Sequence, residues 1–472
     1  MPFPFALPTT SSISFTDYFS SSTHPSLPLC ATTARGVLRD TLKKHKRIPT
    51  SSQASNLPTV QAALNEYISY LFALDSGLSG AKIAGEEIDL ALIKEPEVEW
   101  RATLTAALPG REPGRVNLRS LESEFFFTLS TLGYVYSLLA RAQLHTLYSA
   151  IPPEPEQRSQ AIASAMRYFL KANAVHAYLV NRAGVYNIQP AAVDISTPVL
   201  GALAELTMAE ATLITVLKDD PYPATVIEDR NKQSKDWMYK GVEIPKVRAH
   251  LFARLCLAAA EHAAKAQAML GRAAKVDEKL VKYVDDLRRT ARGKACRFLA
   301  IDTELAGKTG EGIAWLQSAK KELGFSSYDN GEGKSSGFSK LKKGWAERKE
   351  DRKIEKGQDW GADAGKFEEG RIVDMLMQKW VKQNDTIGNQ LIPPWESLVT
   401  AMPSGREYHT SQPFVPPTLD ESSIIKLRAP PEPNDRAFEG NEDDSDMDEE
   451  KTSTPIGGFP GSKSQYSEGS YF

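Results

Sequence analysis

Three groups of residues have types that could do chemistry: the Gly307-Lys308-Thr309 sequence, the seven histidines and the three cysteines. Gly307-Lys308-Thr309 matches the end of a phosphate-binding P-loop, in which a glycine five positions earlier lets backbone N–H groups surround the phosphates. That position is Asp302 here, and the residues just before Gly307 have a helical pattern, whereas a P-loop follows a strand. We therefore do not expect nucleotide binding.

The histidines and cysteines have no spacing typical of a metal site or a catalytic pair. No two histidines stand four residues apart, the spacing that places two ligands on one helix face. His262 follows Cys256 by six residues, so the two side chains do not share a helix face well. Cys30, Cys256 and Cys296 also lack zinc-ligand spacing. We predict that the protein is not an enzyme and needs no metal or other cofactor.

Composition narrows the class of protein further. The chain has 472 residues, of which 41% are hydrophobic, enough for a sizeable core. Its net charge of −3 argues against nucleic acid as a partner. It has no run of eighteen apolar residues, and its start lacks the features of a signal peptide. Position 2 is proline, which excludes N-myristoylation. Together with the few cysteines, these features predict a cytoplasmic protein without a transmembrane segment that is not secreted.

The elements that must position any site are predicted to be helices. Between about residues 34 and 325, long stretches with helical apolar spacing are separated by short turn signals, and we find no convincing alternation typical of strands. Such helical hairpins favour a solenoid-like or bundle core, although no strict 34-residue repeat occurs. The predicted helices cover 121–148, 156–181, 198–218, 245–271, 276–306, 311–323 and 371–382.

Two segments differ in composition from the helical part. Residues 326–366 are rich in Gly, Ser and Lys, and 334–356 carries nine Lys/Arg against four Asp/Glu. We interpret 326–366 either as a mobile, solvated basic insertion or as a patch for an acidic membrane or an acidic partner. Residues 430–472 are predicted to be a disordered acidic and Gly/Ser-rich tail, because eight acidic residues lie in 439–450. The terminal Tyr471-Phe472 pair is a candidate docking peptide.

Four separated segments give a more specific signal. They are Asn65–Phe72, Asp194-Ile-Ser-Thr-Pro198 with the helix to Ala211, Gly307–Leu316, and Glu407-Tyr-His409 with Phe414-Val-Pro-Pro417. Each resembles a segment of the BRO domain family, and the four follow one another as they do in that family. Glu210 and Thr212 replace two glutamines of the family pattern, and Gly312 and Trp315 also depart from it. The resemblance implies a BRO domain over residues 1–425.

Within that family, the chain resembles the short members of the fungal ambient-pH (Pal) response most closely. Met1–Thr10, Arg182–Ile188 and Gly201–Ala211 carry this likeness. It implies an all-α, elongated, boomerang-like domain of tetratricopeptide-like helical hairpins, with a small N-terminal β-element. It also implies a non-enzymatic adaptor that is recruited to endosomes or the plasma-membrane cortex. The implied partners are an ESCRT-III subunit of the Snf/Vps class and the Pal-pathway protease and receptor complex, which activate the PacC zinc-finger transcription factor by proteolysis at alkaline pH.

The resemblance also implies where a partner would bind. Family members hold an amphipathic ESCRT-III helix in an apolar groove, and the matching helix here carries Val247, Leu251 and Leu255 at four-residue spacing. The same stripe is equally typical of an ordinary core face. If Leu251 proves to be core, we expect Leu213 and Leu217 on the preceding helix to contribute instead.

Two other functions are compatible with the sequence. One is a generic ESCRT-associated endosomal sorting factor, although the modules that usually follow a BRO domain in such proteins are missing here. The other, from a different class, is an enzyme or a helical regulatory subunit with an unrecognised site. Binding to an ESCRT-III C-terminal helix would separate these hypotheses from the adaptor hypothesis.

Overall fold

Long helices account for most of the computed structural model, which describes residues 2–107, 112–148, 153–186, 192–226, 246–325 and 360–429. Proline opens several of them: Pro28 lies in the first turn of α1, Pro155 begins α4, and Pro198 lies in the first turn of α5. The class is all-α, as the sequence predicts. The longer helices are α1 (Leu27–Arg47), α2 (Thr50–Ser79), α3 (Leu121–His145), α4 (Pro155–Tyr186), α5 (Thr197–Asp219), α7 (Lys246–Leu270), α8 (Glu278–Leu305), α9 (Thr309–Glu322) and α11 (Lys366–Gln383).

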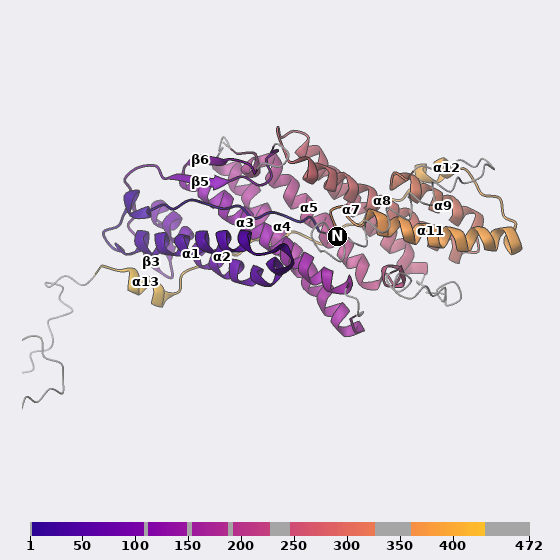
Figure 1. Ribbon diagram of the computed structural model, residues 1–472, viewed down its shortest axis with the longest axis horizontal. Coiled ribbons are helices and arrows are strands. Elements are labelled where there is room, and N and C mark those ends of the chain that lie inside the picture. Colours follow the sequence, from indigo (N-terminus) through magenta and orange to yellow (C-terminus); the bar gives the residue numbers. More distant parts are fainter. Residues whose placement is uncertain are drawn as a thin grey trace, which may run out of the picture. The chain divides into compact units, whose positions relative to one another are not determined.

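Successive helices pack against one another along the chain, as Figure 1 shows. One core joins α1, α2, α3 and part of α4, and another joins α7, α8, α9 and α11. Between them, α5 lies against α4 on one side and α7 on the other. Shorter pieces are η1 (Phe15–Asp17), η2 (Thr146–Tyr148), η3 (Val193–Ile195), the π-helical turn η5 (Asn384–Gly388), α12 (Trp395–Thr400) and α13 (Glu421–Leu427).

In the part of the chain that the structure describes, three small antiparallel pairs of strands make up the β-element. The longest joins β5 (Glu97–Arg101) to β6 (Arg115–Arg119), with Trp100 opposite Val116. The expectation of no strands between residues 34 and 325 is therefore wrong for this stretch. Val98 and Trp100 are buried on alternate positions of β5, but five residues are too few for the alternation to stand out. The shorter pairs are β1 (Phe19–Ser20) with β4 (Ala91–Leu92), and β2 (Lys82–Ile83) with β3 (Glu86–Glu87).

The N-terminal segment packs into the middle of the helical layer. The Phe5 ring stacks on Tyr134 of α3, with ring centroids 4.7 Å apart, and Phe3 lies 5.3 Å from the Tyr283 ring of α8. Both phenylalanines are buried. The sequence suggests only that the N-terminal residues are extended. In the structure, this segment also helps to hold α3 and α8 together.

The boundaries predicted for the basic insertion and the domain need correction. Residues 360–366 are not a mobile part of an insertion, because Trp360 is only 2% exposed and its ring contacts His145 and Tyr148. Residues 326–359 lie outside the described residues, as do 430–472. The compact unit runs from Met1 to Arg428, so the predicted end at 425 would divide α13, whose Ile424 and Leu427 are buried.

One helix has the length and apolar composition to span a bilayer. It is α5, and no other helix among the described residues meets both criteria. In its most apolar 18-residue window, 72% of the residues are buried inside the protein. Such burial is typical of the central helix of a packed core, and here α5 lies between α4 and α7.

Candidate partner-binding site

The helix pair α5 and α7, in which the sequence predicts a groove, carries a segment from near the end of the chain. We call residues 402–409 the strap. The Arg406 N–H donates to the Arg254 carbonyl at 3.0 Å, and Arg254 Nε donates to the Ser404 carbonyl at 3.1 Å. Met402 packs against the α7–α9 core. The strap therefore covers the middle of α7 through backbone contacts.

Gly405 allows the strap to lie this close to α7. A Cβ atom at this position would stand 2.8 Å from the backbone nitrogen of Ala258 and 2.9 Å from its Cα. Side chains do not reach such distances without movement of the backbone. Glycine is therefore required here because the strap backbone lies against the α7 backbone, and not because of an unusual backbone angle.

His262 of α7 holds the strap to α5 through two carboxylates. Its Nδ1 lies 2.6 Å from Glu205 Oε2 of α5, and its Nε2 lies 2.9 Å from Glu407 Oε2 of the strap. Burial alone would lower the pKa of His262, but the hydrogen bonds to Glu205 and Glu407 outweigh burial and raise it above the usual value. Both ring nitrogens face acceptors, so the protonated ring fits this place best.

A second imidazole anchors the end of the strap on α5. His409 Nε2 lies 2.7 Å from Thr215 Oγ1, and the His409 ring contacts Tyr408 edge-on, with ring centroids 4.8 Å apart. The family resemblance implies an aromatic near Thr215 on α5 itself, and α5 has none there. In the structure, the strap brings His409 to this position.

The structure places the predicted groove residues in different surroundings. Leu251 is half-buried and packs against the α7–α9 core, one turn before the part of α7 beneath the strap. Leu255 is 2% exposed and belongs to that core, so it is not part of an open groove. Leu213 packs between α5, α7 and α8, whereas Leu217 contacts a separate cluster with α3 and α4. Val247 begins α7, but its side chain lies outside the described residues, as do Tyr471 and Phe472.

The remaining candidate residues are the Gly307–Thr309 sequence and the cysteines, and their surroundings do not suit catalysis. Gly307 follows helix α8 and not a strand, which removes the P-loop hypothesis. Burial raises the pKa of Cys256 and of Cys296 to about 12, so neither thiol is reactive. No cluster of His, Cys, Asp or Glu among the described residues could hold a metal ion. The sequence Gly333-Lys-Ser-Ser-Gly337 has the letters of a hydrolase nucleophile turn, but it falls outside those residues.

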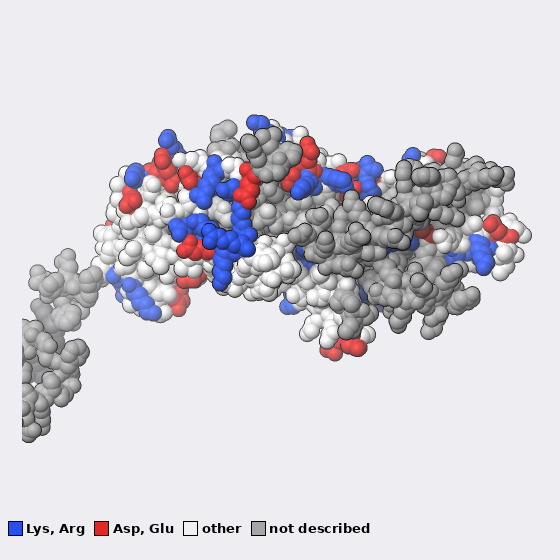
Figure 2. Space-filling view, viewed as in Figure 1, with Lys and Arg blue, Asp and Glu red and all other residues white. Residues whose placement is uncertain are grey.

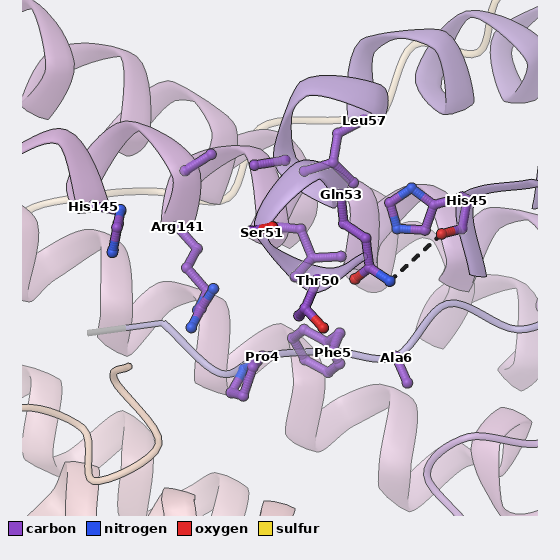
Figure 3. Close-up of a pocket in the computed structure, with 13 residues that line it drawn as sticks. Pro4, Phe5, Ala6, His45, Thr50, Ser51, Gln53, Leu57, Arg141 and His145 are labelled. Atoms are coloured by element: carbon purple, nitrogen blue, oxygen red, sulfur yellow. Dashed lines mark hydrogen bonds between the residues drawn. The ribbon is translucent and has the colours of Figure 1, made fainter. Parts of the chain in front are cut away.

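A pocket of about 510 Å³ lies between the N-terminal segment, the α1–α2 turn and α3. Figure 3 shows Arg141 and His145 on one side of it and His45 and Gln53 on the other. Among the residues that the structure describes, no Asp, Glu or Cys lines it. Burial lowers the pKa of His45, so its ring is neutral at physiological pH.

Two deeply buried charge clusters among the described residues link helices to one another. Arg297 of α8 donates to Asp220 Oδ2 at 2.6 Å, and its Nε donates to Glu369 of α11. In the other cluster, Glu124 of α3 accepts from Arg35 Nε of α1 at 2.7 Å and from Trp100 of β5 at 2.7 Å. Because their charges are mutually satisfied, we assign these clusters to the fold.

Two polar residues of the Asp194–Ala211 segment make hydrogen bonds inside the protein. Asp194 is buried and accepts from the backbone N–H groups of Thr103 and Leu104 at 2.7 and 2.8 Å, which fixes the loop after β5. Glu210 is buried in α5 and accepts from the Tyr283 hydroxyl. Burial raises the pKa of Glu210 to about 7. The sequence pattern of this segment resembles the BRO family, but a pattern alone does not separate these internal roles from partner binding.

Known proteins share both the sequence and the architecture. A family model described as BRO1-like domain matches residues 43–405. The chain is 44% identical to the pH-response regulator protein palC of Emericella nidulans over 503 aligned positions, which cover 98% of this chain and 99% of that protein. It is 32% identical to the protein of the same name from Cryptococcus neoformans over 142 positions, 29% of this chain and 27% of the other.

Solved structures support the fold. The structure described as the ALIX BRO1 CHMP4C complex matches with a TM-score of 0.52 and 14% identity, covering 88% of this chain and 96% of the other. A structure of ALIX with a viral late-domain peptide matches with a TM-score of 0.55 and 14% identity, covering 91% and 51%. Fold and sequence thus define a helical protein of the BRO1 class. The chain belongs to the BRO1-like domain family, and its whole length is similar to palC.

Proposed function

We propose that this protein is a non-enzymatic adaptor of the fungal ambient-pH response. In this proposal it binds an ESCRT-III subunit of the Snf/Vps class through its BRO domain at endosomes or the plasma-membrane cortex. It would thereby bring the Pal-pathway protease and receptor complex to PacC, which is cleaved at alkaline pH. The observation that carries the proposal is the 44% identity to palC along almost the whole of both chains. The fold shared with the BRO1 domain in the ALIX BRO1 CHMP4C complex supports the ESCRT-III part.

For the partner helix we propose the α5–α7 face on the side of Leu251. Leu251 is half-buried, so an apolar anchor of a partner could cover it without unfolding the domain. We include Val247, one turn earlier in the sequence of α7, on the family resemblance alone, and Leu213 of α5 packs against the same core as Leu251. The strap already occupies the later turns of α7. This leaves the first half of α7 as the proposed contact, with Leu255 supporting it from the core.

The test is a binding isotherm of the purified full chain with an ESCRT-III C-terminal helix peptide, together with a thermal melt. Leu251→Asp should weaken binding by about a hundredfold or more, because a charge would stand where an apolar anchor is buried, and the fold should survive. Leu255→Asp is the matched control: it places a charge in the core and should lower the melting temperature strongly.

Two results would contradict this assignment. Normal binding by a folded Leu251→Asp protein would reject the α7 site, and no binding by the unsubstituted protein would reject the ESCRT-III part of the function. In cells, the Leu251→Asp variant should fail to restore PacC cleavage at alkaline pH in a strain that lacks the protein.

A further inference from the structure

The solvent-facing side of α1 carries exposed apolar residues and cations together. Leu29 is 58% exposed and Val37 is 48% exposed. Lys44 and Arg47 are exposed near the end of the same helix. With 100° between successive residues, these four side chains fall within an arc of about 80° and extend over about 27 Å. We call this surface the α1 face.

The end of α1 carries a net positive charge: Lys44 and Arg47 lie on the α1 face, Lys43 lies beside it, and the exposed Asp40 on the same arc pairs with Arg39. Lys43, Lys44 and Arg47 have no acidic partner among the residues that the structure describes. The nearby cations Arg39 and Lys46 do have partners, Asp40 and Glu112. Figure 2 shows Lys and Arg gathered over this part of the molecule.

The next helix adds no negative charge to this end. Asp40 is followed by no Asp or Glu until Glu66, so the start of α2 is uncharged. Lys43, Lys44 and Arg47 also line a hollow of about 600 Å³ with Asp40, Ile48 and Pro49, so three cations face one carboxylate there. Cations at a helix C-terminus favour the helix dipole, but one or two are enough for that effect. Lys43 and Arg47 instead repel each other at four-residue spacing, which an anionic surface would relieve.

We propose that the α1 face is a docking surface for an acidic membrane. An anionic bilayer fits because it offers phosphates to Lys43, Lys44 and Arg47, and shallow apolar depth to Leu29 and Val37, along one straight helix. An acidic polypeptide would satisfy the cations but gives no reason for two large apolar side chains to be exposed beside them. This surface is separate from the α5–α7 face, so it can be tested whether or not that face binds ESCRT-III.

The experiment measures partition of the full-length protein into vesicles of phosphatidylcholine alone or with about 30% phosphatidylserine. Acidic vesicles should bind the protein and neutral ones should not, and added salt should weaken binding. K44E/R47E should lower partition at least about tenfold, since each cation near such a surface contributes measurably. L29S/V37S should lower it several-fold. K279E/K382E reverses two exposed lysines on α8 and α11, changes the net charge equally, and should bind like the unsubstituted protein.

Thermal melts of the variants should match, because all the substituted residues are at least partly exposed. Three outcomes overturn the proposal. The first is no partition of the unsubstituted protein into acidic vesicles. The second is unchanged partition of K44E/R47E, which would move the contact to another basic segment. The third is displacement by a soluble polyglutamate peptide together with no effect of L29S/V37S, which would identify an acidic polypeptide as the partner.

Discussion

At the scale of single residues, several ionisable groups are held in states that differ from those in water. Glu210 is the clearest, because it stands in α5 where the resemblance has glutamine, and burial raises its pKa to about 7. It accepts from the Tyr283 hydroxyl and from the backbone N–H of Phe3. A carboxyl group with this pKa is mostly protonated below about pH 6 and half protonated near pH 7, and in its neutral state it resembles the amide that it replaces.

Glu210→Gln should therefore stabilise the protein, and the gain should depend on pH. The folded-state pKa lies above that of the unfolded chain, so the original protein loses stability as pH rises from about 4.5 through about 7. The glutamine variant avoids this loss, so its advantage should grow over the same range to at most about 3 kcal/mol. Urea unfolding at pH 5 and pH 8 measures it. An equal difference at both pH values would show that Glu210 does not titrate in this range.

His262 should give a pH dependence of stability above neutral pH. Its pKa is raised in the folded protein, so its contribution is complete below the unfolded value of about 6.5 and is lost as pH rises through the folded value. His262→Gln should remove this part of the slope while leaving that of Glu210. We expect the plots of unfolding free energy against pH for the unsubstituted protein and for His262→Gln to converge on the alkaline side. Parallel plots would mean that His262 is not charged between Glu205 and Glu407.

At the scale of elements, the strap is the part of the fold on which the site depends most. It joins a segment near residue 405 to helices near 205 and 258, and its contacts combine backbone hydrogen bonds with the His262 carboxylate pair. Such a segment has no repeating structure of its own and is held by hydrogen bonds of its backbone to α7 and by the side chains of the helices beneath it. It therefore limits how much of α7 a partner can reach.

Gly405→Ala tests the close approach of the strap. The added methyl group would meet the Ala258 backbone, so the strap must shift at a cost of about 1–3 kcal/mol. Gly184→Ala is the matched control, because nothing lies within 4 Å of a Cβ there and alanine favours the α4 helix. Hydrogen exchange at the Arg406 amide should quicken only in Gly405→Ala. Protection that is the same in both variants would contradict the close contact.

At the scale of the whole molecule, the compact domain includes α13 and ends just after it. Ile424 is fully buried and Leu427 is 3% exposed, both in the core formed with α1 and α2. Arg428 also pairs with Glu86 of β3. The segment after the strap thus returns to the N-terminal helices, which ties the end of the compact unit to its beginning.

Two truncations locate the end of the domain. A chain ending at Ala429 should melt at nearly the same temperature as the full chain, because the acidic, aliphatic-poor tail offers little apolar surface to bury. A chain ending at Leu419 loses Ile424 and Leu427 and should be destabilised by about 3–6 kcal/mol. Differential scanning calorimetry distinguishes them. A large loss in the longer truncation would show that residues 430–472 pack on the domain.

The sequence by itself indicated the long helices from residue 121 onward, because helical periodicity and proline caps are local signals, but it did not delimit α1, α2 or α13. It also identified Glu407-Tyr-His409 and Asp194 as special. Only the tertiary structure decided what these residues do, since Glu407 meets His262 across 145 residues and Asp194 meets Leu104 across 90. An apolar stripe such as Leu251–Leu255 looks the same whether it is core or surface. Segments distant in sequence, such as the strap, decide which of its residues remain accessible. A local sequence pattern does not predict where such segments pack.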